Sequence, residues 1–208
     1  IWAFFRKHSL NSQDPVQEVK KTGKIEFIKK EFNHNGLVRS YYMYLPDAWN
    51  TAEKLPLVLI LHGGGKKDGK GLGKHLGFDR IADREGFIAV YPNGIDSSWR
   101  DGRKYTHRGP DDKDIDDVCY ISDLIDYLVE EKKADPSKVY VTGLSNGGMM
   151  TLRLGCEIST KLAAIAPVIA NIPENIFETV PESPLPVLLM NGTDDPLVPW
   201  SGGEVRFL

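Results

Sequence analysis

One seven-residue segment constrains this chain more than any other. Residues Thr142–Gly148 read TGLSNGG, with a β-branched and aromatic run at Val139–Val141 before them and a helix-like segment at Met149–Glu157 after them. A strand that turns directly into a helix needs a tight bend, and large side chains two residues either side of Ser145 would clash there. Glycine stands at both of these positions. The pattern predicts a strand–turn–helix unit that exposes the Ser145 hydroxyl at the carboxyl end of a sheet.

Two further apolar runs end in polar segments. Leu57–Leu61 is continuously apolar, as expected of a parallel strand buried on both faces, and His62–Gly65 follows it directly. Pro186–Met190 is predicted to be another buried strand, and it leads into residues 191–199, which contain two adjacent aspartates. The chain thus places a glycine loop, a serine turn and an acidic loop after three predicted strands.

These segments fit nucleophilic attack by a serine on an ester carbonyl. Backbone N–H groups aimed at the developing negative charge contribute about 3–4 kcal/mol each to such a reaction. We assign one donor to Asn146, the residue after the serine, and the other to Gly64, with Gly65 as the next choice. We interpret His62 as a brace for the glycine loop and not as a catalytic base.

The combination resembles the polyhydroxybutyrate depolymerase and feruloyl esterase family of α/β-hydrolases. Besides the three segments above, the resemblance rests on YPNG at 91–94 with Ser98-Trp99, and on DDV at 116–118 leading into ISDLI at 121–125. It implies a serine esterase that uses a Ser-His-Asp triad and needs no metal or organic cofactor. The implied partners are small-molecule or polymeric esters: short-chain esters, hydroxyalkanoate polyesters, or feruloyl and acetyl groups on polysaccharide.

The resemblance also selects the triad acid. The family motif His-Gly-x-x-Asp-x-x-Val-Pro aligns with Gly192 and with the Val-Pro pair at 198–199, which identifies Asp195 and not Asp194. Asn191 replaces the histidine of that motif, which is not the catalytic one. An acid at this position would orient the catalytic histidine and stabilise its protonated form.

The catalytic histidine is the unassigned member of the triad. The family carries it well downstream of the acid, but all five histidines of this chain precede Ser145, and positions 196–208 contain none. Three explanations stay open: the chain is C-terminally incomplete and the histidine lies beyond Leu208; His107 substitutes; or the protein is a non-catalytic relative that acts as a binding protein. Trp99 and Trp200 are candidates for an aromatic substrate wall, although Trp99 could equally pin its own loop.

Strand and helix patterns alternate along the chain, which predicts an α/β-hydrolase fold with a mostly parallel sheet and helices on both faces. Residues 24–32 and 37–45 should form an N-terminal antiparallel hairpin, because Asn-Gly stands between them. Residues 1–23 are predicted to be an arm, either a targeting remnant or a segment packed on the domain, and 24–208 the hydrolase domain. Residues 66–74 are predicted to be a glycine–lysine loop; they lack the order of a phosphate-binding loop.

Composition excludes several functions. The net charge of −3 argues against a nucleic-acid partner, and no apolar run is long enough to span a membrane. No ligand spacing predicts a metal site. Cys119 and Cys156 lie in predicted helices, either as free thiols or as one disulfide. The resemblance implies a secreted or periplasmic protein, and the sequence does not indicate an oligomeric state.

Overall fold

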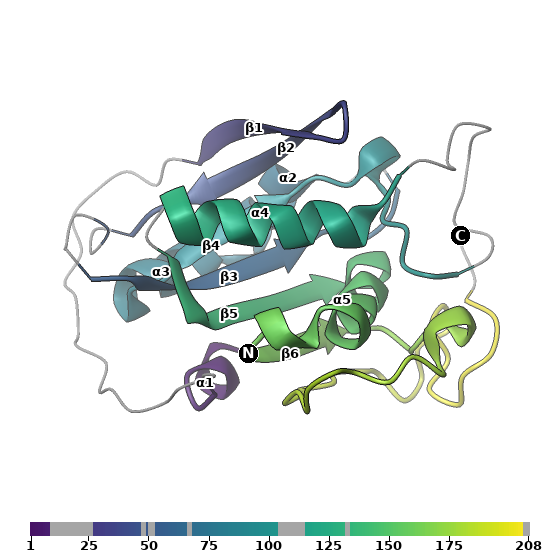
Figure 1. Ribbon diagram of the computed structural model, residues 1–208. Helices are drawn as coiled ribbons and strands as arrows, with labels where there is room; N and C mark the ends of the chain where they lie inside the picture. The colour runs from purple at the N-terminus through teal and green to yellow at the C-terminus, as the bar shows by residue number, and fades with distance from the viewer. Residues whose placement is uncertain are drawn as a thin grey trace.

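A computed structural model describes residues 1–8, 27–46, 49, 53–65, 68–103, 115–131 and 134–205, and it contains a six-stranded sheet in the order β1-β2-β4-β3-β5-β6 (Figure 1). The strands are β1 (Ile28–His34), β2 (Leu37–Tyr44), β3 (Leu55–Leu61), β4 (Ile88–Pro92), β5 (Ala134–Leu144) and β6 (Ala164–Val168). The α-helices are α1 (Trp2–Phe5), α2 (Gly69–Leu76), α3 (Phe78–Glu85), α4 (Asp117–Glu131) and α5 (Asn146–Glu157). Short 3-10 turns are η2 (Ile95–Ser97), η4 (Ser159–Lys161) and η5 (Glu174–Ile176).

The sheet begins with the predicted hairpin. β1 and β2 pair antiparallel around a two-residue turn in which Asn35 has φ 50° and Gly36 has φ 79°, the positive angles that a tight hairpin turn requires. β2 also pairs antiparallel with β4, whereas the pairs β3–β4, β3–β5 and β5–β6 are parallel. The predicted hairpin and mostly parallel sheet are confirmed.

Helices cover both faces of this sheet, as predicted. Alternate residues of β3 point to opposite sides, so that Leu57 and Leu59 join the core beneath α4 and α5 while Val58 and Ile60 join the core beneath α1 and α3. Figure 1 shows α4 and α5 in front of the sheet and α2 and α3 behind it. The parallel strands therefore end together at one edge, where the loops that follow them can meet.

The segment predicted to be a glycine–lysine loop forms α2, so this prediction was wrong for the described part of it. Asp68 caps the helix by accepting a hydrogen bond from Gly71 N at 2.7 Å. A Cβ atom on Gly69 would lie 2.4 Å from Tyr91 O, and one on Gly73 would lie 2.8 Å from the ring of Phe27. These glycines allow the helix to approach β4 closely and do not mark a loop.

The predicted strand at Pro186–Met190 is only partly formed. Two isolated parallel bridges, from Val187 and Met190, join it to β6. Leu188 packs against the core beneath α1 and α3, but Val187 and Leu189 are 49% and 48% exposed. The prediction of a buried strand was therefore only partly right, because alternate residues of this segment are exposed.

The first residues of the predicted arm pack on the domain. The Trp2 ring stacks on Phe87 with centroids 4.3 Å apart, and the Phe5 ring stacks on Tyr140 at 4.8 Å. Both side chains are buried. Of the two readings of the arm, these contacts favour a packed segment; the predicted boundary between residues 23 and 24 lies outside the described residues.

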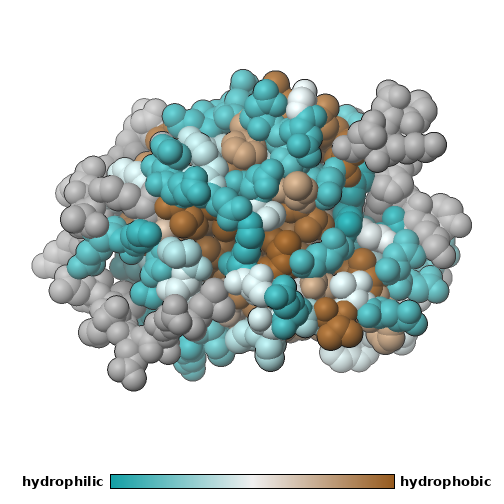
Figure 2. Space-filling model, in the orientation of Figure 1, coloured by the Kyte–Doolittle hydropathy of each residue, from teal (hydrophilic) through white to brown (hydrophobic). Residues whose placement is uncertain are grey.

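Several large apolar side chains are exposed on the segment that follows β6. Figure 2 shows brown surface at the lower right, over the segment that follows β6 in Figure 1. Large apolar side chains exposed in this segment are Ile172, Phe177, Val180, Val187, Leu189 and Trp200. No described helix is long and apolar enough to cross a bilayer.

Buried side chains of β3 should contribute more to the free energy of unfolding than the exposed side chains that follow β6. Leu59 is fully buried and Val180 is 85% exposed. We expect Leu59→Ala to lower the free energy of unfolding by about 2–5 kcal/mol, because it removes buried apolar surface and leaves a cavity. Val180→Ala, the control, should change it by less than about 0.5 kcal/mol. Urea unfolding of the two variants measures this, and equal losses would contradict the assignment of the core.

Candidate active site

Ser145 lies in the strained turn that the sequence predicts. It joins β5 to α5 with φ 56° and ψ −117°, a conformation that side-chain-bearing residues rarely adopt. Its amide donates to Val168 O of β6 at 2.9 Å, and its carbonyl accepts the first hydrogen bond of α5 from Met149 N at 2.8 Å. These hydrogen bonds from β6 and α5 therefore sustain the strained backbone of Ser145. Its side chain lies at the carboxyl edge of the sheet and is partly exposed.

The glycines around Ser145 are required by backbone contacts. A Cβ atom on Gly143 would lie 2.3 Å from Gly147 O, and one on Gly147 would lie 2.5 Å from both Leu61 O and His62 O. No side chain fits at these distances. The predicted steric reason for glycine at both positions is confirmed.

The glycine loop after β3 lies directly beside the serine turn. A Cβ atom on Gly63 would lie 3.7 Å from Ser145 Cβ, and one on Gly64 would lie 3.5 Å from Asn146 Cβ. The two segments that the sequence predicts to donate to an oxyanion are thus neighbours. This proximity is what an oxyanion site at Gly64 and Asn146 needs, and the donor roles themselves stay a prediction.

His62 braces this loop. The Gly94 amide donates to His62 Nε2 at 2.9 Å, so Nε2 is the unprotonated nitrogen and Nδ1 donates to Gly63 O at 2.8 Å. Burial lowers the pKa of His62, against smaller opposing effects of the Gly63 hydrogen bond and of Asp68 and Asp117. Both ring nitrogens are occupied, which confirms the bracing role.

Trp99 is fully buried, and its indole N–H donates to His62 O at 2.9 Å. Its ring lies 5.0 Å from that of His62. The side chain thus supports the glycine loop through its hydrogen bond to His62 O, and it exposes no face to a substrate. Of the two interpretations of Trp99, the contacts favour the one in which it pins its own loop; Trp200, by contrast, is 59% exposed.

The Asn146 side chain ties α5 to the loop that carries Trp99. Its Oδ1 accepts from Trp99 N at 2.7 Å, and its Nδ2 donates to Trp99 O at 3.0 Å and to Asp101 Oδ2 at 2.6 Å. All of these groups are buried. The side chain is therefore structural, and it fixes the position of the backbone amide that we assign to the oxyanion site.

Two buried aspartates, Asp101 and Asp117, complete this support. Asp101 also accepts from Arg103 Nη2 at 2.6 Å. Asp117 accepts from Arg39 Nη2 at 2.6 Å and from the Arg100 amide at 2.8 Å. In the sequence, Asp101 is marked only by its position near Trp99, and Asp117 only by its position in the motif at 116–118.

Asp195 stands in a loop that packs on the start of α5. Val198 of this loop joins Met149 and Ala170 in a small apolar cluster. Asp195 Oδ1 accepts from the amides of Leu197 at 2.8 Å and Val198 at 2.9 Å, and these bonds lower the pKa of its carboxyl. The second oxygen has no such backbone donor among the described residues, and Asp194 is exposed.

Asn191, which replaces a motif histidine, holds the same region together. Its Oδ1 accepts from Ala170 N at 2.9 Å, while its Nδ2 donates to Ala170 O at 2.9 Å and to Asn171 Oδ1 at 3.1 Å. The Asn171 side chain in turn donates to Pro199 O at 2.8 Å. These bonds fasten the Asp195 loop to the end of β6.

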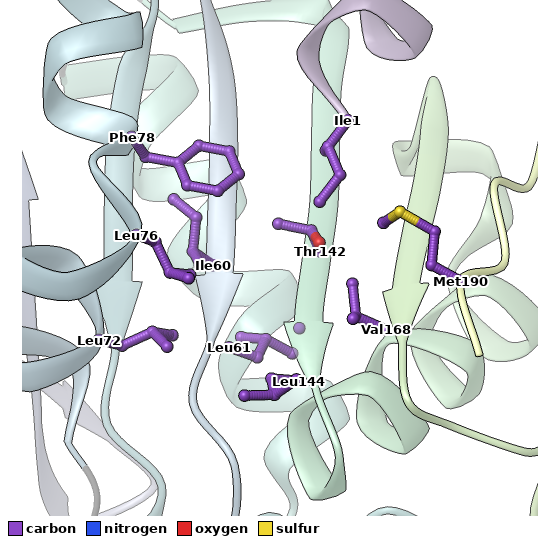
Figure 3. Close-up of a pocket in the computed structure, with 11 residues that line it drawn as sticks. Ile1, Ile60, Leu61, Leu72, Leu76, Phe78, Thr142, Leu144, Val168 and Met190 are labelled. Atoms are coloured by element: carbon purple, nitrogen blue, oxygen red, sulfur yellow. The ribbon is translucent and has the colours of Figure 1, made fainter. Parts of the chain in front are cut away.

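An apolar cavity of about 170 Å³ lies beneath the serine turn, on the face of the sheet that α1 and α3 cover (Figure 3). Leu144, which directly precedes Ser145, is one of its lining residues. The others are Ile1, Ile60, Leu61, Leu72, Leu76, Phe78, Thr142, Gly143, Val168 and Met190. The Thr142 hydroxyl donates to Ala166 O. Among the described residues, no acidic or basic side chain lines this cavity.

The model of one protein family, described as Esterase PHB depolymerase, matches residues 39–171. The chain belongs to this family. The matched range includes Gly64, Trp99, Ser145 and Asn146, and it ends before Asp195.

Individual proteins agree with this membership. This PHB depolymerase family chain is 35% identical over 169 residues to a protein of Nocardia uniformis subsp. tsuyamanensis named "Putative esterase NocK", covering 80% of this chain and 48% of that protein. It is 31% identical over 172 residues to the bifunctional acetylxylan esterase/xylanase XynS20E of Neocallimastix patriciarum, covering 81% of this chain and 23% of that protein. The chain spans about half the length of the first relative and less of the second.

A solved structure supports the fold. A thermostable esterase superimposes with a TM-score of 0.66 at 23% identity, over 85% of this chain and 49% of that one. Together with the sheet order and the serine turn, this likeness identifies the α/β-hydrolase fold in the PHB depolymerase family chain.

A methyl group at the serine turn should be severely destabilising. We expect Gly147→Ala to cost about 3 kcal/mol or more in the free energy of unfolding, because the new Cβ meets two backbone oxygens that cannot move independently. Gly71→Ala is the matched control in the first turn of α2, where the nearest atom is the Asp68 side-chain oxygen at 3.1 Å. Urea unfolding compares them, and similar stabilities would contradict the steric requirement.

His62 should make stability fall in mild acid. In the unfolded chain His62 should titrate near pH 6.5, whereas its pKa in the folded chain is lower. Between these two pKa values, His62 therefore binds more protons in the unfolded chain than in the folded one. The stabilisation is complete above about pH 6.5 and decreases as the pH falls toward the folded pKa. Between about pH 7.5 and 5.5 the melting temperature of His62→Gln should therefore fall less than that of the wild type. The exposed His75→Gln control should keep the wild-type dependence; identical behaviour of both variants would refute the assignment.

Proposed function

We propose that the whole protein is a serine carboxylic-ester hydrolase that works through an acyl-enzyme. The observation that supports this most is the contact between the strained Ser145 turn and the Gly63-Gly64 loop. A partly exposed serine beside two candidate backbone donors suits attack on a carbonyl carbon. Membership of an esterase family supports the same reaction class.

In the proposed reaction Ser145 Oγ bonds to the ester carbonyl carbon and loses its proton to a histidine. The amides of Asn146 and Gly64 hold the negative oxygen of the tetrahedral intermediate. When the intermediate collapses, the alcohol leaves with the proton from the histidine, and water then releases the acid from Ser145. Asp195, whose carboxyl pKa is lowered by two backbone hydrogen bonds, orients the histidine.

The general base is not assigned to a described histidine. His62 has both ring nitrogens bonded, and His34 is bonded to Asp123 on α4. His107 lies outside the described residues. We propose that a histidine of the whole protein outside these 208 residues completes the triad, so that His107→Ala should retain esterase activity. Loss of activity in that variant would assign the base to His107 instead.

The proposed substrates are short-chain esters, hydroxyalkanoate polyesters, or acetyl and feruloyl esters of polysaccharides. One relative is named as an acetylxylan esterase, which supports the polysaccharide class. The exposed Trp200 ring is the remaining candidate for an aromatic wall. The ratio of activities on methyl ferulate and p-nitrophenyl butyrate discriminates aryl from short acyl preference. Export to the periplasm or medium stays a prediction.

Two substitutions in the whole protein test the mechanism. Ser145→Ala should lower kcat by about 10⁶-fold and abolish labelling by a fluorophosphonate, whereas Ser122→Ala, on α4, should change neither.

Asp195→Asn should lower kcat by about 10⁴-fold, and Asp194→Asn by less than about 10-fold. A larger loss of kcat in Asp194→Asn than in Asp195→Asn would assign the triad acid to Asp194 instead. A wild-type protein that binds esters but is not labelled would support the non-catalytic alternative.

A further inference from the structure

Three side chains with metal-binding donors meet where the β1–β2 hairpin reaches α4. His34 ends β1, and Cys119 and Asp123 are four residues apart on α4. One donor atom from each lies within 4.8 Å of the other two. Among the described residues this is the only such group of histidine, cysteine and acidic side chains. β2, β4 and β3 separate β1 from the strand that carries Ser145.

We propose that His34, Cys119 and Asp123 bind a zinc ion. An imidazole nitrogen, a thiolate and a carboxylate are the donor types that zinc takes, whereas calcium and magnesium take oxygen alone. Three protein ligands leave one position of a tetrahedral ion for water. The charges balance, because one thiolate and one carboxylate neutralise a divalent cation.

The geometry is partly prepared for the ion. His34 is 4% exposed, and its Nδ1 lies 3.0 Å from Asp123 Oδ2. Its position is fixed by the end of the hairpin, and its Nε2 lies 3.3 Å from the Asn35 amide, which on rotation offers either a donor or an acceptor. A tetrahedral zinc with ordinary bond lengths separates its donors by about 3.3–3.6 Å. The cluster reaches this by small movements of Cys119, which is half-buried, and of Asp123, whose side chain is 48% exposed.

Negative charge gathers around the cluster. The Cys119 amide donates to Asp116 Oδ1 at 2.9 Å, and Asp123 lies one helical turn further along α4. Lys161 is engaged elsewhere, bonded to Ser122 Oγ and Asp126 Oδ2 at 2.7 Å and 2.6 Å. On binding, the zinc–sulfur bond forms and the thiol proton leaves to solvent.

The ion would fasten the edge of the sheet to a helix. β1 pairs with β2 alone, and its contacts with α4 include the Phe32 ring beside Tyr120 and Tyr127, with centroids 6.1 Å and 5.6 Å apart. A zinc ion held by both elements would join them at the hairpin end. Binding should therefore stabilise the folded chain.

The test uses chelator-treated protein with Co²⁺ as a spectroscopic probe and Zn²⁺ as competitor. The wild type should take up one equivalent of Co²⁺ with a thiolate charge-transfer band, lose the band when Zn²⁺ displaces it, and melt at a higher temperature with Zn²⁺. Cys119→Ser and Asp123→Asn should each weaken Zn²⁺ binding by at least about 10-fold. Cys156→Ser, which removes the other thiol, should bind as the wild type does.

Melting curves without metal show whether each variant is folded, so that a lost site is distinguished from an unfolded chain. A wild type without the thiolate band, or a Cys119→Ser variant with unchanged Zn²⁺ affinity, would overturn the proposal. None of these readouts depends on ester hydrolysis, so their outcome is independent of the proposed function.

Discussion

The serine turn depends on a backbone contact that leaves no space for a side chain. Gly147 lies against the carbonyl oxygens that end β3, and Gly143 lies against Gly147 O. This packing lets α5 begin immediately after Ser145, so that the first amides of the helix face the same edge of the sheet as the glycine loop after β3. The unfavourable φ of Ser145 is sustained because β6 and α5 both hydrogen-bond its backbone.

A buried polar network holds the loops around this turn. The side chains of Asn146 and His62 each accept a hydrogen bond from a backbone amide of a neighbouring loop. Trp99 links the two, because its amide donates to the Asn146 side chain and its indole N–H donates to His62 O. Deeper in the molecule, the Arg39 guanidinium lies 3.8 Å above the Tyr120 ring and pairs with Asp117, both charges being almost completely buried. Removal of either charge would leave the other buried without compensation, which makes such pairs sensitive to substitution. The network positions the site through groups that need not touch a substrate.

Local backbone requirements made much of the fold predictable. The Asn35-Gly36 turn needs two positive φ angles, and the Ser145 turn needs glycine on both sides; each is recognisable from adjacent residues alone. The continuous apolar run of β3 reflects a strand that is buried on both faces of the sheet. The predicted bracing by His62 also followed from its place beside three glycines.

The remaining features depend on residues that are distant in sequence. The glycines of α2 resembled a loop because the atoms that require them, on Tyr91 and Phe27, belong to other elements. Trp99 could not be placed from sequence because its burial depends on the loop that ends β3, and His34 meets Cys119 and Asp123 only where the hairpin reaches α4. The sequence by itself determined the serine turn, the glycine loop and the alternation of strands and helices, since short-range sterics and periodic burial specify them. Only the tertiary structure decided which polar side chains are supports and which gather as the proposed zinc site, because those contacts exist only when the elements pack.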